Sequence, residues 1–217
     1  MPSKEGDYMD IIQNLVDSSK YSLKCPNKLD AKYIVVHNTA NDASAKNEIA
    51  YMISTNVATS FHFAVDDEEI VQGIPLERTA FHAGDGRNGK GNKHGIGIEI
   101  CYSKSGGNRF IEAEKKAAKL IAYLLKKYNL DISAVIKHQD CSGKYCPHRT
   151  LDMGWERFVD MVKSEIETNN INEPSAWAKT AWQWATERGY VDGTNPKGTV
   201  TREMLVQVLY NLYGKEK

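Results

Sequence analysis

The sequence predicts an α/β fold in which a central mixed β-sheet is flanked by helices, with a small helical C-terminal module. Three observations predict it. Short segments rich in β-branched residues indicate strands, amphipathic helical patterns lie between them, and a polar stretch separates the C-terminal part from the rest. Strands that alternate with helices favour a sheet covered by helices over an all-β or all-α domain.

The expected strands are short, β-branched or alternating in pattern, and bounded by turn residues. They are Tyr33–Val36, Ser60–Val65, Gly95–Ile100 and Ala134–Ile136. Helical periodicity predicts helices over Asn47–Ser54, Glu112–Tyr128 and Trp155–Ile166. The second of these helices has the clearest pattern, because its apolar residues Ala117, Leu120, Ile121 and Leu124 fall on one face.

A polar stretch that ends in a proline divides the chain into unequal parts. Thr168, Asn169 and Asn170 followed by Pro174 predict a linker over residues 167–175. The linker separates a larger domain over residues 1–166 from a helix-loop-helix module over residues 176–217.

The composition argues against several classes of partner. The 217 residues carry 28 Lys and Arg against 28 Asp and Glu, and the charges also balance over residues 1–166 and over residues 167–217, so we expect no charge-driven binding of nucleic acid. No apolar stretch approaches the roughly 20 residues that cross a bilayer, and the first residues lack the apolar segment of a signal peptide. We therefore expect no membrane association and synthesis in the cytoplasm without a signal peptide.

The cysteines and several polar residues are candidates for chemistry. The four cysteines, Cys25, Cys101, Cys141 and Cys146, are too few for a disulfide scaffold in a chain of this length, so each is a core residue, a ligand or a nucleophile. Polar side chains follow three strands where they end, in segments 36–39, 98–99 and 137–148. Strand ends on a rigid sheet can hold side chains with the precision that catalysis needs.

Two histidines and one cysteine form a candidate zinc site. Catalytic zinc takes three nitrogen or sulfur ligands and keeps a fourth position open, and His37, His138 and Cys146 would supply that set. Glu99, at the end of an otherwise apolar strand, is the candidate proton acceptor, because desolvation raises its proton affinity. Lys144 is the candidate for stabilising an oxyanion. Each residue taken alone also fits a structural role.

Five stretches carry a resemblance to a known family from about Ser18 to Ile166. They are KYIVVHNTA at 32–40, SFHFAVDD at 60–67, QGIPLERTAFHAGDG at 72–86, GIGIEICYSKSGG at 95–107 and KHQDCSGKYCPHR at 137–149. The chain resembles the zinc-dependent N-acetylmuramoyl-L-alanine amidases, a group that includes phage endolysins and peptidoglycan recognition proteins. It is most similar to phage and prophage enzymes of the Bacillus and Clostridium groups.

This resemblance implies a zinc amidase domain over residues 1–166 that hydrolyses peptidoglycan between the lactyl group of N-acetylmuramic acid and the L-Ala of the stem peptide. It implies Zn²⁺ held by His37, His138 and Cys146, with Glu99 as the acidic catalytic residue and Lys144 matching the family's lysine. The residues expected to contact substrate are His62, His82, Asn38 and Thr39. Family endolysins reach the wall from the cytoplasm through a separate membrane-permeabilising protein, so the chain is expected to act at the cell wall after release.

The C-terminal module has two apolar helix faces. One face includes Trp177 and Trp184, and the other is made of Met204, Leu205, Val208, Leu209 and Leu212. The segment resembles one S-layer-homology-type repeat, which implies binding of a secondary cell-wall polymer with Trp177, Trp184 and Arg202 as contacts. The alternative is a packing or dimerisation appendage, since two such helices seldom bury enough surface to fold alone.

Two other functions remain open from the residues. One is a cysteine peptidase or amidase that uses Cys146 or Cys141 with His138. The other is a wall-binding module without catalysis.

Overall fold

The computed structural model describes residues 10–213, apart from the side chains of residues 169–172, 212 and 213. The chain separates into two compact units, Met1–Glu165 and Ile166–Lys217. Within residues 10–213, no helix combines the length and the apolar character needed to cross a membrane.

The first unit is built on a six-stranded sheet with the strand order β1-β4-β3-β5-β2-β6. Its strands are β1 (Ile11–Gln13), β2 (Tyr33–Asn38), β3 (Phe63–Val65), β4 (Ile70–Gln72), β5 (Gly95–Ile100) and β6 (Val135–Lys137). The pair β3 and β4 is antiparallel, whereas the other neighbouring strands run parallel. The expected mixed sheet is therefore confirmed.

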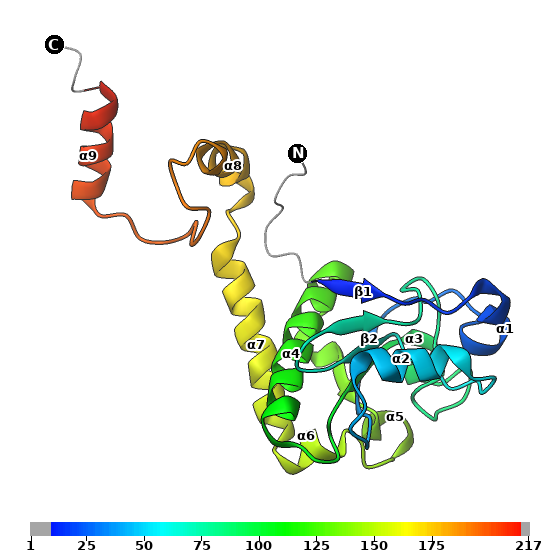
Figure 1. Ribbon diagram of the computed structural model, residues 1–217. Helices are drawn as coiled ribbons and strands as arrows, with labels where there is room; N and C mark the ends of the chain where they lie inside the picture. The colour runs from blue at the N-terminus through cyan, green and yellow to red at the C-terminus, as the bar shows by residue number, and fades with distance from the viewer. Residues whose placement is uncertain (1–9, 214–217) are drawn as a thin grey trace. The chain divides into compact units, whose positions relative to one another are not determined.

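Helices connect most of the strands (Figure 1). They are α1 (Tyr21–Lys24), α2 (Ala45–Ser54), α3 (Lys90–His94), α4 (Gly107–Tyr128), α5 (Gln139–Ser142), α6 (His148–Asp152), α7 (Trp155–Asn172), α8 (Lys179–Glu187) and α9 (Arg202–Tyr213), with 3₁₀ turns at Ser18–Lys20, Ile132–Ala134 and Ala176–Ala178. The three helices predicted in the larger domain correspond to α2, α4 and α7, and the two predicted in the C-terminal module correspond to α8 and α9. The predicted strands correspond to β2, β3, β5 and β6, so β1 and β4 are additions.

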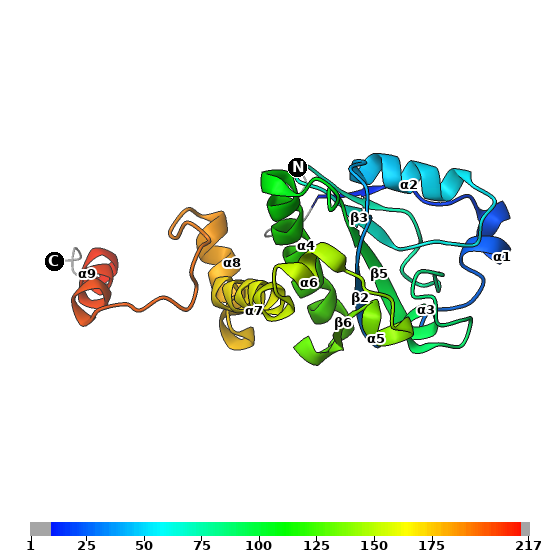
Figure 2. The ribbon, with the colours of Figure 1, turned by 90° about the horizontal axis from the view of Figure 1, so that it is seen from below.

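Helices cover both faces of the sheet. Residues Ile34 to Asn38 of β2 are all buried, which requires cover on both sides. Figure 2 shows the strands between α4 on one side and α2 with α3 on the other. The predicted apolar face of α4, Ala117, Leu120, Ile121 and Leu124, is fully buried. Packing of that face, rather than local propensity alone, stabilises α4.

The largest difference between the sequence prediction and the structure lies at the end of α7. That helix continues to Asn172, so the predicted end at Ile166 is wrong and most of the expected 167–175 linker is helical. Asparagine and threonine weaken a helix only slightly, whereas a proline disfavours helical backbone at the residue before it. The helix accordingly ends two residues before Pro174.

The second unit leaves its apolar side chains exposed. Trp177 is 88% exposed and Trp184 50%, and Met204, Leu205, Val208 and Leu209 on α9 are each about half exposed. The side chain of Leu212 lies outside the described residues. The predicted face of Met204, Leu205, Val208 and Leu209 lies on α9. Trp177 lies in the 3₁₀ turn Ala176–Ala178 and Trp184 on α8, so the other predicted face is not carried by one helix. Neither set forms a buried core within this unit.

Candidate functional site

Three adjacent parallel strands carry the site at their carboxyl ends. His37 on β2 lies directly opposite Glu99 on β5 in the strand register. On the other side of β2, His138 follows β6, and its backbone N–H donates to the carbonyl of Val36 at 3.2 Å. Because residues at the same level of neighbouring strands point to the same face, the sheet itself brings these three side chains together.

The two histidines and Cys146 form a compact donor set. His37 Nδ1 lies 2.9 Å from His138 Nδ1, and one donor atom from each of the three residues lies within 4.8 Å of the others. All three residues are buried. The chain returns from His138 to Cys146 through α5 and a left-handed turn at Gly143, whose φ of 79° is readily adopted only by glycine.

The chemistry of this donor set fits zinc. Burial lowers the pKa of His37 well below its usual value and also lowers that of His138, so both rings are neutral, as metal ligands must be. Burial raises the pKa of the Cys146 thiol to about 11, although the backbone N–H groups of Asn38 and His148 and the charge of Lys144 oppose the shift. A thiol in this environment becomes a thiolate when a cation lies beside it.

Glu99 has the environment of a general base. It is half-buried overall, but its Oε2 atom is inaccessible and has no hydrogen-bond partner among the residues that the structure describes. Burial, together with the nearby charge of Glu48, raises the pKa of Glu99 to about 8, and Lys144 partly offsets this. A carboxylate with a pKa near the working pH can both accept and return a proton.

A cleft of about 580 Å³ opens beside His138. It is lined by Ala58, Thr59, Phe81, His82, Gly84, Gly86, Arg87, Asn92, His138, Ser142 and Lys144.

Lys144 is exposed, and its charge lowers the pKa of His37 and His138, which places it within electrostatic reach of the donor set. Arg87 adds a second cation and lies over the Phe81 ring at 5.5 Å. Sequence reasoning missed Arg87 and Phe81, although both fall in or beside the family-like stretch 72–86.

Two of the residues expected to contact substrate have structural partners. His62 is fully buried, its Nε2 donates to the Arg78 carbonyl at 2.9 Å, and its Nδ1 accepts from the Gly97 N–H at 3.0 Å. Asn38 is also buried, with both ends of its amide bonded to the protein. Every polar side-chain atom of these two residues thus has a protein partner, and substrate contact at them stays a prediction.

The other two residues expected to contact substrate differ from each other. His82 lines the cleft, but both of its ring nitrogens have protein partners. Thr39 is half-buried, and its hydroxyl lies 3.5 Å from the Asn41 carbonyl oxygen. Substrate contact at Thr39 stays a prediction.

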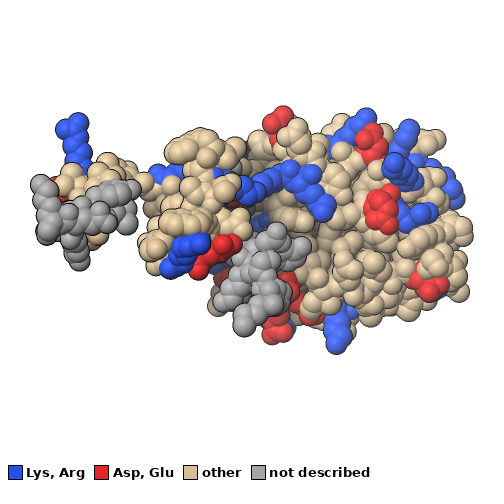
Figure 3. Space-filling view, turned by 90° about the horizontal axis from the view of Figure 1, so that it is seen from above, with Lys and Arg blue, Asp and Glu red and all other residues tan. Residues whose placement is uncertain are grey.

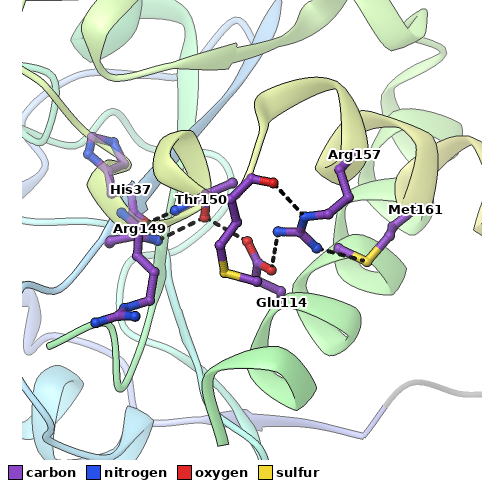
Figure 4. A network of polar contacts seen from close by, with 8 residues as sticks. His37, Glu114, Arg149, Thr150, Arg157 and Met161 are labelled. Atoms are coloured by element: carbon purple, nitrogen blue, oxygen red, sulfur yellow. Dashed lines mark hydrogen bonds and ion pairs between the residues drawn. The ribbon is translucent and has the colours of Figure 1, made fainter. Parts of the chain in front are cut away.

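A polar network ties β2 to the loop that carries the thiol (Figure 4). Glu114 on α4 is fully buried, and its carboxylate accepts from Thr150 Oγ1 at 2.8 Å and from Arg157 Nη2 at 2.6 Å. Since a carboxylate only accepts, the Thr150 hydroxyl donates to it and can accept from Asn38 Nδ2 at 3.3 Å. The Asn38 carbonyl oxygen then accepts from the backbone N–H groups of Arg149 and Thr150 at the start of α6. The network therefore links the strand that carries His37 to the segment that follows Cys146, and so fixes the spacing between these two candidate ligands.

Comparison with known proteins identifies the family. A family profile described as N-acetylmuramoyl-L-alanine amidase matches residues 27–149. The chain is also 51% identical over 178 residues to the amidase XlyB and 56% identical over 176 residues to the amidase CwlA, both of Bacillus subtilis strain 168. The chain belongs to the N-acetylmuramoyl-L-alanine amidase family. These alignments cover 82% and 78% of this chain, and 56% and 65% of the respective relatives.

Solved structures of amidase-family proteins share the fold. The structure of PlyL has a TM-score of 0.70 at 52% identity, and the match covers 71% of this chain and 97% of PlyL. The catalytic domain of XlyA has a TM-score of 0.65 at 38% identity, covering 71% and 99%. The mixed sheet flanked by helices is thus the fold of these amidases.

The residues expected to bind the wall lie in the second unit. Trp177, Trp184 and Arg202 are all exposed. Arg188 lies over the Trp184 ring at 4.8 Å, and Tyr190 packs against the same ring with centroids 5.2 Å apart. This cluster around Trp184 was not predicted, and nothing in it specifies a ligand.

Proposed function

We propose that this chain is a zinc-dependent peptidoglycan amidase that hydrolyses the amide between the lactyl group of N-acetylmuramic acid and the L-Ala of the stem peptide. The observation that carries the proposal is the row of Glu99, His37 and His138 on adjacent strands, with Cys146 closing the donor set. The membership of the amidase family supports it.

The chain's own residues divide the chemistry among them. A zinc ion held by His37, His138 and Cys146 would polarise the amide carbonyl and lower the pKa of a water molecule. Glu99 accepts the proton of the attacking water and returns it to the leaving amine of L-Ala. The ammonium of Lys144 stabilises the negative charge that develops on the carbonyl oxygen.

The environment of the thiols argues for a ligand rather than a nucleophile. A catalytic thiol needs a lowered pKa, but burial raises the pKa of both Cys146 and Cys141 to about 11. In addition, the Nδ1 atom of His138 lies 2.9 Å from Nδ1 of His37, so this nitrogen is engaged with another histidine rather than with a thiol. These features favour the zinc amidase over the thiol hydrolase.

The test is digestion of purified cell walls by the full chain. We expect new amino groups without new reducing sugars, loss of activity with a chelator, and recovery with Zn²⁺. Appearance of reducing ends would contradict the amidase assignment. Activity that survives the chelator but is lost with iodoacetamide would instead indicate the thiol enzyme, and wall binding without amine release would indicate a binding module.

The proposal includes a role at the wall for the second unit. Its exposed aromatic residues Trp177 and Trp184 suit contact with a carbohydrate polymer, because they present large apolar rings to solvent. In this proposal the enzyme acts at the cell wall. A homodimer through the C-terminal helices stays a prediction, which sedimentation equilibrium of the full chain checks.

A further inference from the structure

One short segment contacts both candidate histidine ligands. His37 Nε2 lies 2.9 Å from His82 Nδ1, with the two rings perpendicular and their centroids 5.0 Å apart. The His138 ring is hydrogen-bonded to the backbone of the next residue, Ala83. His37 and His138 face each other through their Nδ1 atoms, which border the candidate metal position. His82 and Ala83 therefore contact the two rings on the side away from that position.

The direction of the hydrogen bonds at His82 follows from its other partner. His82 Nε2 lies 3.3 Å from the carbonyl oxygen of Gly95, which can only accept, so Nε2 carries the proton. A neutral imidazole has a single N–H, so the Nδ1 of His82 is an acceptor once its Nε2 donates to Gly95. It accepts from the Nε2–H of His37, which leaves the lone pair of His37 Nδ1 for the metal.

The position of His82 is itself fixed from two sides. The Oδ1 atom of the buried Asn92 accepts from the backbone N–H groups of His82 and Ala83, both at 2.8 Å. Behind the ring, a Cβ on Gly97 of β5 would lie 2.6 Å from His82 Cγ. Any larger residue at position 97 would therefore displace the imidazole.

We propose that His82 is a positioning residue of the zinc centre, which fixes the tautomer and the orientation of His37 so that Nδ1 faces the metal. This inference rests on the proposed function, because it requires zinc at the site. It replaces the predicted substrate contact of His82, since neither ring nitrogen is left for a substrate. A partner bonded to the second nitrogen of a ligand histidine raises metal affinity, because it fixes the tautomer and the orientation of the ligand ring.

The test measures the zinc affinity of the full chain by competition with a chromophoric chelator. His82→Phe keeps a ring but removes the acceptor, and we expect zinc affinity to fall by about 10- to 100-fold. His82→Asn returns an acceptor near the position of Nδ1 and should recover most of the affinity. Gly97→Ala keeps His82 but places a methyl group against its ring, so it should displace the imidazole and also lower zinc affinity.

A matched control separates this role from general loss of stability. His62 is also buried, and its ring centroid lies 6.2 Å from that of His82, but its hydrogen bonds go to Arg78 and Gly97 rather than to a ligand. His62→Asn should leave zinc affinity within about twofold, as expected for a substitution outside the donor set. Cobalt substitution adds a second readout. The visible absorption bands should shift in His82→Phe and stay unchanged in His62→Asn.

The outcomes distinguish this inference from the proposed function. A wild-type chain that binds zinc and releases amino groups, together with His82→Phe of unchanged affinity and cobalt spectrum, would overturn the positioning role alone. Equal losses in His82→Phe and His62→Asn would also overturn it. A wild-type chain that binds no zinc would contradict both proposals.

Discussion

Burial sets the protonation behaviour of single residues around the cleft. It raises the pKa of Glu99 on β5 to about 8 and lowers the pKa of His62, the residue directly before β3, to about 4. Removal from water disfavours the charged form of each side chain. The carboxyl group of Glu99 therefore stays protonated to a higher pH, and the imidazole of His62 stays neutral to a lower pH. The first shift suits the proton acceptor proposed above, and the second keeps a buried histidine neutral.

Replacing Glu99 tests its role as the proton acceptor. Glu99→Gln keeps the size of the side chain and removes its basicity, so turnover should fall by about 100-fold or more. Zinc content should stay the same, because Glu99 is outside the donor set. Amine release from walls and metal analysis of the same preparation check both points, and unchanged turnover would refute the role.

The buried His62 predicts acid sensitivity of the fold. Its pKa is about 4 when folded and near 6.5 when unfolded, so between these values only the unfolded chain takes up the proton. Stability should be complete above the unfolded value and fall by about 3 kcal/mol as the pH drops through this window. The pH dependence of denaturant unfolding gives the number of protons taken up on unfolding. Within this pH window, His62→Asn should take up about one proton fewer than the wild type. Equal pH slopes for the two proteins would argue against a neutral buried His62.

At the scale of elements, the long periodic segments were predictable and the shortest ones were not. The strands β2 and β5 and the helix α4 have enough apolar residues for their pattern to be read. By contrast, β1 and β4 have three residues each, too few for a period. The five-residue α3 begins where the Asp85 carboxylate accepts from the backbone N–H groups of Gly91 and Asn92, which is a side-chain contact rather than a pattern.

The ion pair between α4 and α7 should contribute to stability through both partners. Glu114 is fully buried and Arg157 partly exposed. Glu114→Leu leaves Arg157 and the Thr150 hydroxyl without their acceptor, and we expect a loss of about 2 kcal/mol. Adding Arg157→Leu should cost less than the sum of the two single changes, because the double variant leaves no uncompensated charge. Urea unfolding of the four proteins measures this coupling, and strict additivity would show that the pair contributes nothing specific.

For the whole molecule, the absence of a net charge bears on how the enzyme finds its substrate. Basic and acidic side chains are interspersed on the face of the first unit that Figure 3 shows. The chain as a whole carries equal numbers of each, and so do residues 1–166 and residues 167–217. In the proposed function, attraction to an anionic wall would therefore provide little of the binding, and specific contacts in the cleft and the second unit would provide it.

Wall binding should accordingly depend on the C-terminal residues and little on salt. Deleting residues 174–217, after the end of α7, should weaken binding to purified walls while hydrolysis of a soluble muramyl peptide continues. Binding of the full chain should change only slightly between about 50 mM and about 200 mM salt, where exposed charge pairs are progressively screened. Wall pull-down at both salt concentrations measures these effects. Unchanged binding after the deletion would show that the second unit is dispensable.

The sequence by itself determined which residue types stand at the ends of the strands. His37, Glu99 and His138 stand at or just after the ends of strands whose patterns are readable from the chain, and parallel strands bring their carboxyl ends to one edge. Only the tertiary structure decided which of the polar residues near the site are bonded to protein partners. His62, Asn38 and His82 obtain their roles from partners 13 to 112 positions away, such as Gly95 and Thr150. A buried hydrogen bond between distant segments leaves no periodic mark on the sequence, because it depends on packing that the whole chain must first complete.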